Sequence, residues 1–240
     1  VYLFGIHRGM LSMPGHTLYG SLGSSRFFIE KANSTGSVVW LKIIGNTTTV
    51  EEESNINNQI TTDQCGNLYI ACGYSNNPVI GVDSFVNKGA DDILILKCDS
   101  SGNIIWAKSF GGTSEDYVNG IRVAKSGDIY FGGSTHSDTL RFGTILLRDT
   151  TEPVTYSLLR SCNSFIVKLD NWGNTIWAKN NGGYAFCMLT DMAIDDSEEV
   201  FITGNYGPRR VTDSLPGVPT KLIFGSDSTV NDAGFFIVKY

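Results

Sequence analysis

The sequence predicts an all-β fold in which a four-stranded antiparallel unit repeats about three and a half times. One block of sequence, at 166–179, recurs at 95–108 and at 29–42. The lysines that share one position of this block, including a fourth partial copy, are 66, 71 and 71 residues apart: Lys31, Lys97, Lys168 and Lys239. Short β-branched and aromatic runs between Gly- and Asn-containing turns favour strands. A repeat of this length indicates an array of similar units.

Each period contains four strand types, which we name A to D in chain order. Residues 121–124 represent type A, 68–70 type B, 93–96 type C and 104–107 type D. The type C run is apolar throughout, which is typical of a strand that is buried on both faces. The other types alternate more, so we expect each of them to have a wetter side.

The links between strands fall into two classes. The A–B and C–D links are short, as at 63–67 and 99–103, and carry Gly where a hairpin needs positive φ. The B–C and D–A links vary in length and sequence: 7–26, 75–90, 136–163 and 206–232, and 47–59, 113–119 and 184–190. Antiparallel order places the short hairpins at one end and the variable links at the other. Variable links on a rigid scaffold are typical of a binding surface.

Tandem four-stranded units favour a β-propeller, in which each unit is one blade. The run 165–177 followed by Gly182-Gly183, and the run 95–112, resemble the SBBP β-propeller repeat. The sequence departs from that pattern at Cys72, where the family has Gly, and at the turn 196–199, which lacks Gly. The resemblance implies a secreted or cell-surface bacterial protein, and it brings no catalytic motif with it.

The repeat also predicts the organisation of the chain. Residues 1–240 read as one propeller segment, with repeat units of approximately 1–67, 68–128 and 129–199 and a partial unit at 200–240. The first blade lacks strand A and the last lacks strand D. We therefore expect the segment to belong to a larger propeller of roughly six to eight blades. Two alternatives stay open: two chains completing one ring, or a compact ring of the four blades present.

The composition of the chain excludes some classes of partner and ligand. The net charge is −6 and the pI about 5.0, which disfavours a nucleic-acid partner because such a partner needs a basic surface. No apolar run approaches the roughly 18–20 residues of a membrane helix, so no transmembrane segment is predicted. The five cysteines lack zinc-site spacing, and we expect no metal and no cofactor. We expect the recurring tryptophans to pack between blades: Trp40, Trp106 and Trp177. We expect the four lysines above to lay their stems over apolar strand surface and to keep the ammonium in water.

Six loop residues are candidate partner contacts, although each also fits a solvated loop. Adjacent Arg209 and Arg210 beside Tyr206 suit a carboxylate or sulfate. Glu115 and Asp116 lie in a D–A link and suit a cation or a basic partner. The sixth, in a B–C link, is His136.

These observations predict a non-catalytic extracellular binding or scaffold module that recognises a protein or glycan through its B–C and D–A links. One alternative is a structural subunit of a bacterial surface or secretion assembly. Another is a propeller-based hydrolase or lyase, which needs acidic or His side chains converging within about 5–6 Å. The loop surface and the faces of the terminal blades are where these hypotheses differ.

Overall fold

The computed structural model describes residues 1–13, 15–20, 25–47, 58–149, 162–183, 186–207, 221–224, 226–230 and 233–240. Every regular element within these ranges is a β-strand, so the all-β prediction is confirmed. No helix in the described part of the chain has the length and apolar character needed to cross a bilayer.

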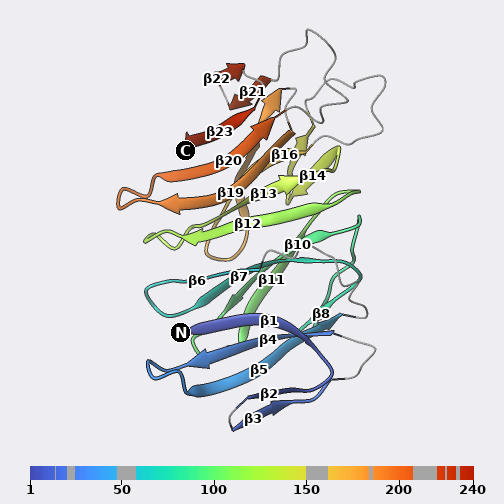
Figure 1. The fold of residues 1–240 in the computed structure, drawn as a ribbon, viewed down its shortest axis with the longest axis vertical. Coiled ribbons are helices and arrows are strands. Elements are labelled where there is room, and N and C mark those ends of the chain that lie inside the picture. Colours follow the sequence, from blue (N-terminus) through green and yellow to red (C-terminus); the bar gives the residue numbers. More distant parts are fainter. Residues whose placement is uncertain are drawn as a thin grey trace.

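The repeated sheets, which we call blades, follow one another along the long axis of the molecule (Figure 1). Blade 1 contains β1 (Tyr2–Arg8), β4 (Ser25–Ala32) and β5 (Val38–Thr47). Blade 2 contains β6 (Gln59–Thr62), β7 (Leu68–Tyr74), β10 (Asp92–Cys98) and β11 (Ile104–Phe110). Blade 3 contains β12 (Asp116–Val123), β13 (Ile129–Thr135), β16 (Asn163–Leu169) and β17 (Thr175–Asn180). Blade 4 contains β19 (Phe186–Ile194), β20 (Val200–Gly207) and β23 (Gly234–Lys239). All pairs are antiparallel, and the strands run in the predicted order A to D.

The core lies between blades rather than within one. Three apolar clusters fill the successive interfaces, and each draws side chains from two neighbouring sheets. Between blades 2 and 3, Phe131 contacts the rings of Phe110, Phe142 and Phe165. Type C strands are buried on both faces because a blade covers each side, as the apolar run of β10 indicates.

The recurring tryptophans link each blade to the next, which confirms their predicted packing role. The lysines differ: Lys168 pairs with Asp128 of its own blade, whereas Lys97 is buried rather than in water. The indole Nε1–H of Trp106 donates to the carbonyl oxygen of Asn171, 3.1 Å away in the C–D turn of blade 3. The ammonium of Lys97 lies 5.1 Å from the ring centre of Tyr69 and donates to the side chain of Asn171. Gly102 occupies the matching turn of blade 2, where an added Cβ would lie 2.7 Å from Trp40.

The B–C links were predicted only as variable loops, but they contain β-hairpins. They are β2 (Leu11–Met13) with β3 (His16–Leu18), β8 (Val79–Ile80) with β9 (Asp83–Ser84), β14 (Thr139–Phe142) with β15 (Ile145–Arg148), and β21 (Lys221–Phe224) with β22 (Asp227–Val230). Strand β8 pairs with β5 of blade 1, and β21 pairs with β18 (Gly182–Gly183), just after β17. In blade 3, Arg141 bridges Gly111 beyond the end of β11. Three of these hairpins therefore attach a blade to the one before it.

Candidate interaction surface at the loop end

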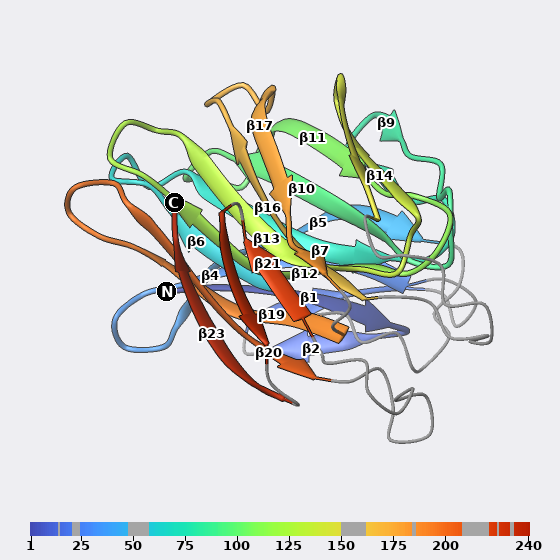
Figure 2. The ribbon, with the colours of Figure 1, turned by 90° about the horizontal axis from the view of Figure 1, so that it is seen from above.

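The two ends of the blades differ as predicted. The A–B and C–D hairpins, such as β12–β13 and β19–β20, lie together on the left in Figure 1, whereas β8 and β14 lie on the right. Figure 2 shows the A–B hairpins β12–β13 and β19–β20 on the left, and β9 and β14 on the right. We call the two ends the hairpin end and the loop end.

The hairpin end is built from one repeated turn. The side chain of Asp99 accepts hydrogen bonds from the backbone N–H of Ser101 and Asn103, at 2.9 and 2.8 Å. Asp170 does the same with Trp172 and Asn174. These bonds satisfy the turn internally and explain the Asp-x-x-Gly-Asn pattern as hairpin chemistry.

The loop end is where links of neighbouring blades join. Between blades 2 and 3, the backbone N–H of Asp116 donates to the carbonyl oxygen of Asp91 at 2.8 Å. The N–H of His136 donates to the carbonyl oxygen of Glu115 at 2.9 Å. The His136 ring stacks edge-on to Tyr117, with ring centres 6.0 Å apart. The structure thus brings together three of the predicted residues, Glu115, Asp116 and His136, at one blade interface.

Asp116 is a buried structural carboxylate. It accepts hydrogen bonds from the backbone N–H of Gly112 at 2.6 Å, from the Ser137 hydroxyl at 3.1 Å and from the Thr135 hydroxyl. Burial raises its pKa to about 6 despite these bonds. Because the side chain is sealed from solvent, its carboxylate holds the links in place and does not face a partner, which corrects its prediction as an exposed contact.

A second buried carboxylate, Asp92, holds the B–C link of blade 2 to its own sheet. Its Oδ2 accepts from the backbone N–H of Lys88 at 3.0 Å and from the Tyr74 hydroxyl at 3.4 Å. Burial raises the pKa of Asp92, and burial followed by the nearby charge of Glu115 raises the pKa of Asp91. The carboxylates of Asp92 and Asp116 therefore hold the links in place, and the side chains of Asp91 and Glu115 are half-buried.

The remaining predicted contacts lie elsewhere. Tyr206 packs in the core between blades 3 and 4, and its ring would lie 3.0 Å from a Cβ added at Gly234. Its ring is therefore not an exposed contact, contrary to the prediction. Arg209 and Arg210 lie outside the described residues. Among the described residues, no three His, Cys, Asp or Glu side chains are arranged to hold a metal ion.

The described B–C links expose apolar side chains that the sequence analysis did not single out. Tyr19 and Met10 in the link of blade 1 are 72% and 67% exposed, and Val82 and Val86 in the link of blade 2 are also exposed. In the sequence they could have been recognised as apolar residues within links whose sequence varies from one repeat to the next. Exposed apolar groups of this kind mark interaction sites when they gather on one region of a protein.

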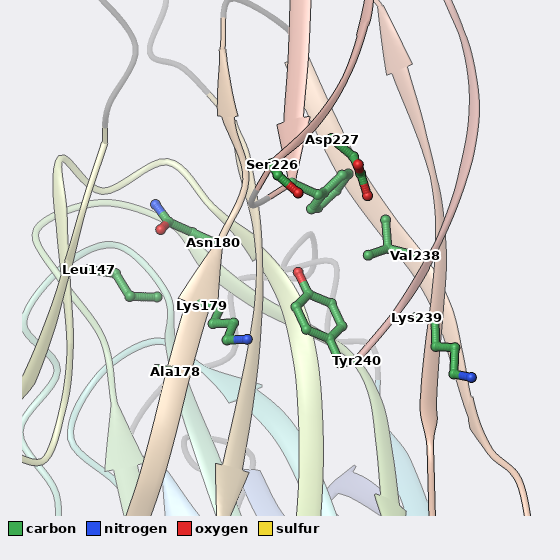
Figure 3. Close-up of a pocket in the computed structure, with 10 residues that line it drawn as sticks. Leu147, Ala178, Lys179, Asn180, Ser226, Asp227, Val238, Lys239 and Tyr240 are labelled. Carbon is green, nitrogen blue, oxygen red and sulfur yellow. The ribbon is translucent and has the colours of Figure 1, made fainter.

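A pocket of about 540 Å³ lies beside blade 4 (Figure 3). Lys179 and Asn180 of β17 approach it from one side, and Val238 and Lys239 of β23 from the other. The ring of Tyr240 points into it. The type C strands β10 and β16 each pair with a type D strand, β11 and β17. Among the described residues, the type C strand β23 pairs only with β20. The pocket therefore lies between the outermost described strands of blades 3 and 4.

Comparison with known proteins gives distant relatives. No family model matches the chain. It is 22% identical over 229 residues to an uncharacterized WD repeat-containing protein of Acanthamoeba polyphaga mimivirus, covering 87% of this chain and 16% of that protein. It is 25% identical over 130 residues to the regulatory protein FlaEY of Caulobacter vibrioides, covering 54% of this chain and 12% of that protein. The chain thus spans less than a fifth of either relative. With the stacked sheets, the first similarity indicates a repeat protein of the propeller-like class.

Proposed function

We propose that the chain is a non-catalytic interaction module that binds a protein partner through its loop end, with a glycan as the second ligand class. The observation that carries the proposal is the exposure of Tyr19, Met10, Val82 and Val86 on links held by a rigid repeat. Aromatic and Met side chains are enriched at protein interfaces. Similarity to a WD repeat-containing protein also favours a protein partner.

Location and origin are part of this proposal. The resemblance of the repeat to SBBP sequences supports an exported bacterial protein that acts outside the cell or at its surface, in a larger surface complex. Fractionation of the source cells with an antibody against this chain tests it. Recovery in the cytosolic fraction alone would contradict the extracellular location and leave the binding proposal standing.

Two equally exposed aromatic residues at opposite ends give a matched test of the binding surface. Tyr19 lies at the loop end and is 72% exposed, whereas Trp172 lies at the hairpin end and is 71% exposed. Proteins of the source extract, and a glycan array, are screened with the wild-type chain, and Kd is measured for each retained species. We expect Tyr19→Ala with Met10→Asp to weaken binding about tenfold or more, as an interface hot spot does, and Trp172→Ala to leave it unchanged. The reverse pattern would place binding at the hairpin end and overturn the proposal.

We also propose a structural role, in which the four blades belong to a larger propeller of six to eight blades. The outer face of blade 4 supports this. Ile237 of β23 is 74% exposed, whereas the residues at the same repeat position are fully buried by the next blade: Ile29, Ile95 and Ile166. On the outer face of blade 1, Leu3 is exposed where Ile70, Phe131 and Ile202 are buried. Both faces have the chemistry of a blade interface.

Self-association of this chain tests the structural role. If the end faces dock like blades, wild-type protein forms dimers or larger species at micromolar concentration in sedimentation experiments. We expect Ile237→Lys to reduce that association, because it places a charge at the centre of an apolar face. Ile105→Lys is the control, since Ile105 of β11 is also exposed but lies on an outer strand. A monomeric wild type, or an equal effect of both variants, would contradict the role.

A further inference from the structure

Two cysteines meet at the interface of blades 3 and 4. Cys162 immediately precedes β16, Cys187 lies in β19, and both are buried. The backbone N–H of Cys187 donates to the carbonyl oxygen of Cys162 at 2.9 Å. The thiol of Cys162 donates to the carbonyl oxygen of Cys187 at 3.4 Å. Strands joined by such hydrogen bonds lie about 4.7–4.9 Å apart, and disulfides span roughly 4.4–6.8 Å between Cα atoms, so a disulfide can bridge this contact.

The side chains of the two cysteines also approach each other between the two sheets, beside Ser164. The sulfur of Cys187 lies 3.0 Å from the hydroxyl oxygen of Ser164. Ser164 follows Cys162 by two residues, so the two project from the same face of the strand. Burial, and then the neighbouring Cys187 thiol, raise the pKa of Cys162 to about 12. The two thiols are therefore neighbours in space.

The repeat shows what this position does in the preceding interface. The residues 71 positions earlier are Asp91 and Asp116, whose backbone groups make the same hydrogen bond at 2.8 Å. There, the Asp116 carboxylate fastens the links through Gly112, Thr135 and Ser137. At the interface of blades 3 and 4 the same two positions are Cys162 and Cys187. This pair therefore has no carboxylate to accept such hydrogen bonds.

The other three cysteines do not have this geometry. Cys72 pairs with Leu94 across β7 and β10, and Leu94 is four residues from Cys98. At about 3.3 Å per strand residue the two are roughly 13 Å apart, well beyond the reach of a disulfide. Cys65 is exposed in a turn. These thiols serve as internal controls.

We propose that Cys162 and Cys187 form a disulfide that fastens blade 3 to blade 4 at the loop end when the chain folds in an oxidising environment. The oxidant is a small disulfide such as oxidised glutathione. One thiolate attacks it, releasing a glutathione thiol and leaving a mixed disulfide, which the second thiolate attacks to release the second thiol. Two electrons and two protons pass from the cysteines to the two glutathione thiols.

The burial of the two thiols determines at which stage of folding the disulfide forms. The thiolate is the attacking species, and burial raises the pKa of Cys162 to about 12 and that of Cys187 to about 11. The pair therefore reacts slowly in the folded protein and forms its bond during folding or local opening. Once formed, the bond is shielded from reductants by the same burial. This inference does not depend on what the loop end binds.

The test is refolding of the whole chain with reduced and oxidised glutathione, and separately with excess reductant. We expect peptide mass spectrometry to find Cys162 linked to Cys187, with Cys72 and Cys98 alkylated as free thiols. Closing this 25-residue loop is expected to raise Tm by on the order of 5–10 °C relative to the reduced protein. Reductant added to the folded oxidised protein reverses the shift slowly.

Serine variants separate the bond from the packing of the side chain. Cys162→Ser and Cys187→Ser each remove the difference in Tm between oxidised and reduced samples, whatever their own stability, and Cys65→Ser keeps it. If either variant fails to fold, the peptide map of the wild type decides alone. Free thiols at both positions after oxidative refolding, or a link to another cysteine, would overturn the inference.

Discussion

Gly133→Ala is expected to destabilise the protein by about 3 kcal/mol or more, because the new Cβ would meet the backbone of the neighbouring strand β12. A Cβ built on Gly133 lies 1.8 Å from the carbonyl oxygen of Tyr117. Strand β12 has a bulge between Val118 and Gly120 that alters its register with β13 just after this position. The clash is with backbone, so no rotamer change relieves it. Urea unfolding checks this, with a lower midpoint and an unchanged slope.

Gly73→Ala is the matched control for this substitution. Gly73 lies in β7, and the nearest atom to its added Cβ is the carbonyl oxygen of Asp92 at 4.0 Å, an ordinary contact. We expect a change within about 1 kcal/mol. Equal losses in the two variants would show that the crowding of Gly133 by Tyr117 is not the cause. The same comparison accounts for Cys72, the repeat counterpart of Gly133, because described β6 begins at Gln59 opposite Ala71 and does not extend over Cys72.

Asp116→Asn is expected to change how stability depends on pH. The pKa of Asp116 is raised from 3.8 to about 6 in the folded state, so the folded protein binds this proton more tightly than the unfolded chain. The contribution of Asp116 to stability is therefore highest below pH 4 and falls as pH rises to about 6. Relative to Asp116→Asn, the wild type should lose about 2 kcal/mol of unfolding free energy between pH 4 and 7. Urea unfolding of both proteins across this range measures the difference.

Asp116→Asn also lowers the free energy of unfolding by an amount that does not depend on pH. Its amide group cannot accept from both the Gly112 N–H and the Thr135 hydroxyl, so one buried donor loses its partner. Asp99→Asn is the control, because hydrogen bonds from Asn103 lower the pKa of Asp99 and give the opposite sign: stability is lost as pH falls below about 4. A constant difference between Asp116→Asn and wild type from pH 4 to 7 would contradict the prediction.

The strand order, the turns and the packing of the repeated Trp residues could be predicted from the sequence, because each depends on contacts that recur with the period. The turn at Asp99 is closed by bonds within five residues, so local sequence determines it. Trp106 recurs because every blade meets a copy of the same turn.

The structural features that could not be predicted from the sequence depend on contacts between different repeats. The hairpin β8–β9 forms its extra pairing with β5 of the preceding blade, and nothing local in its sequence specifies that partner. Tyr206 and Asp116 were expected in loops, yet neighbouring blades cover both. The pairing of Cys162 with Cys187 likewise follows from the register between two blades, which a single period does not reveal.

The attachment of B–C hairpins to the preceding blade has a consequence for how the array unfolds. A blade that opens exposes its own half of an apolar interface and also strips a strand from its neighbour, as β8 would leave β5. Nearest-neighbour coupling of this kind makes partly unfolded arrays rare, since each boundary between folded and unfolded blades costs free energy. The array should therefore melt in a single concerted transition, even though its parts are copies that look separable.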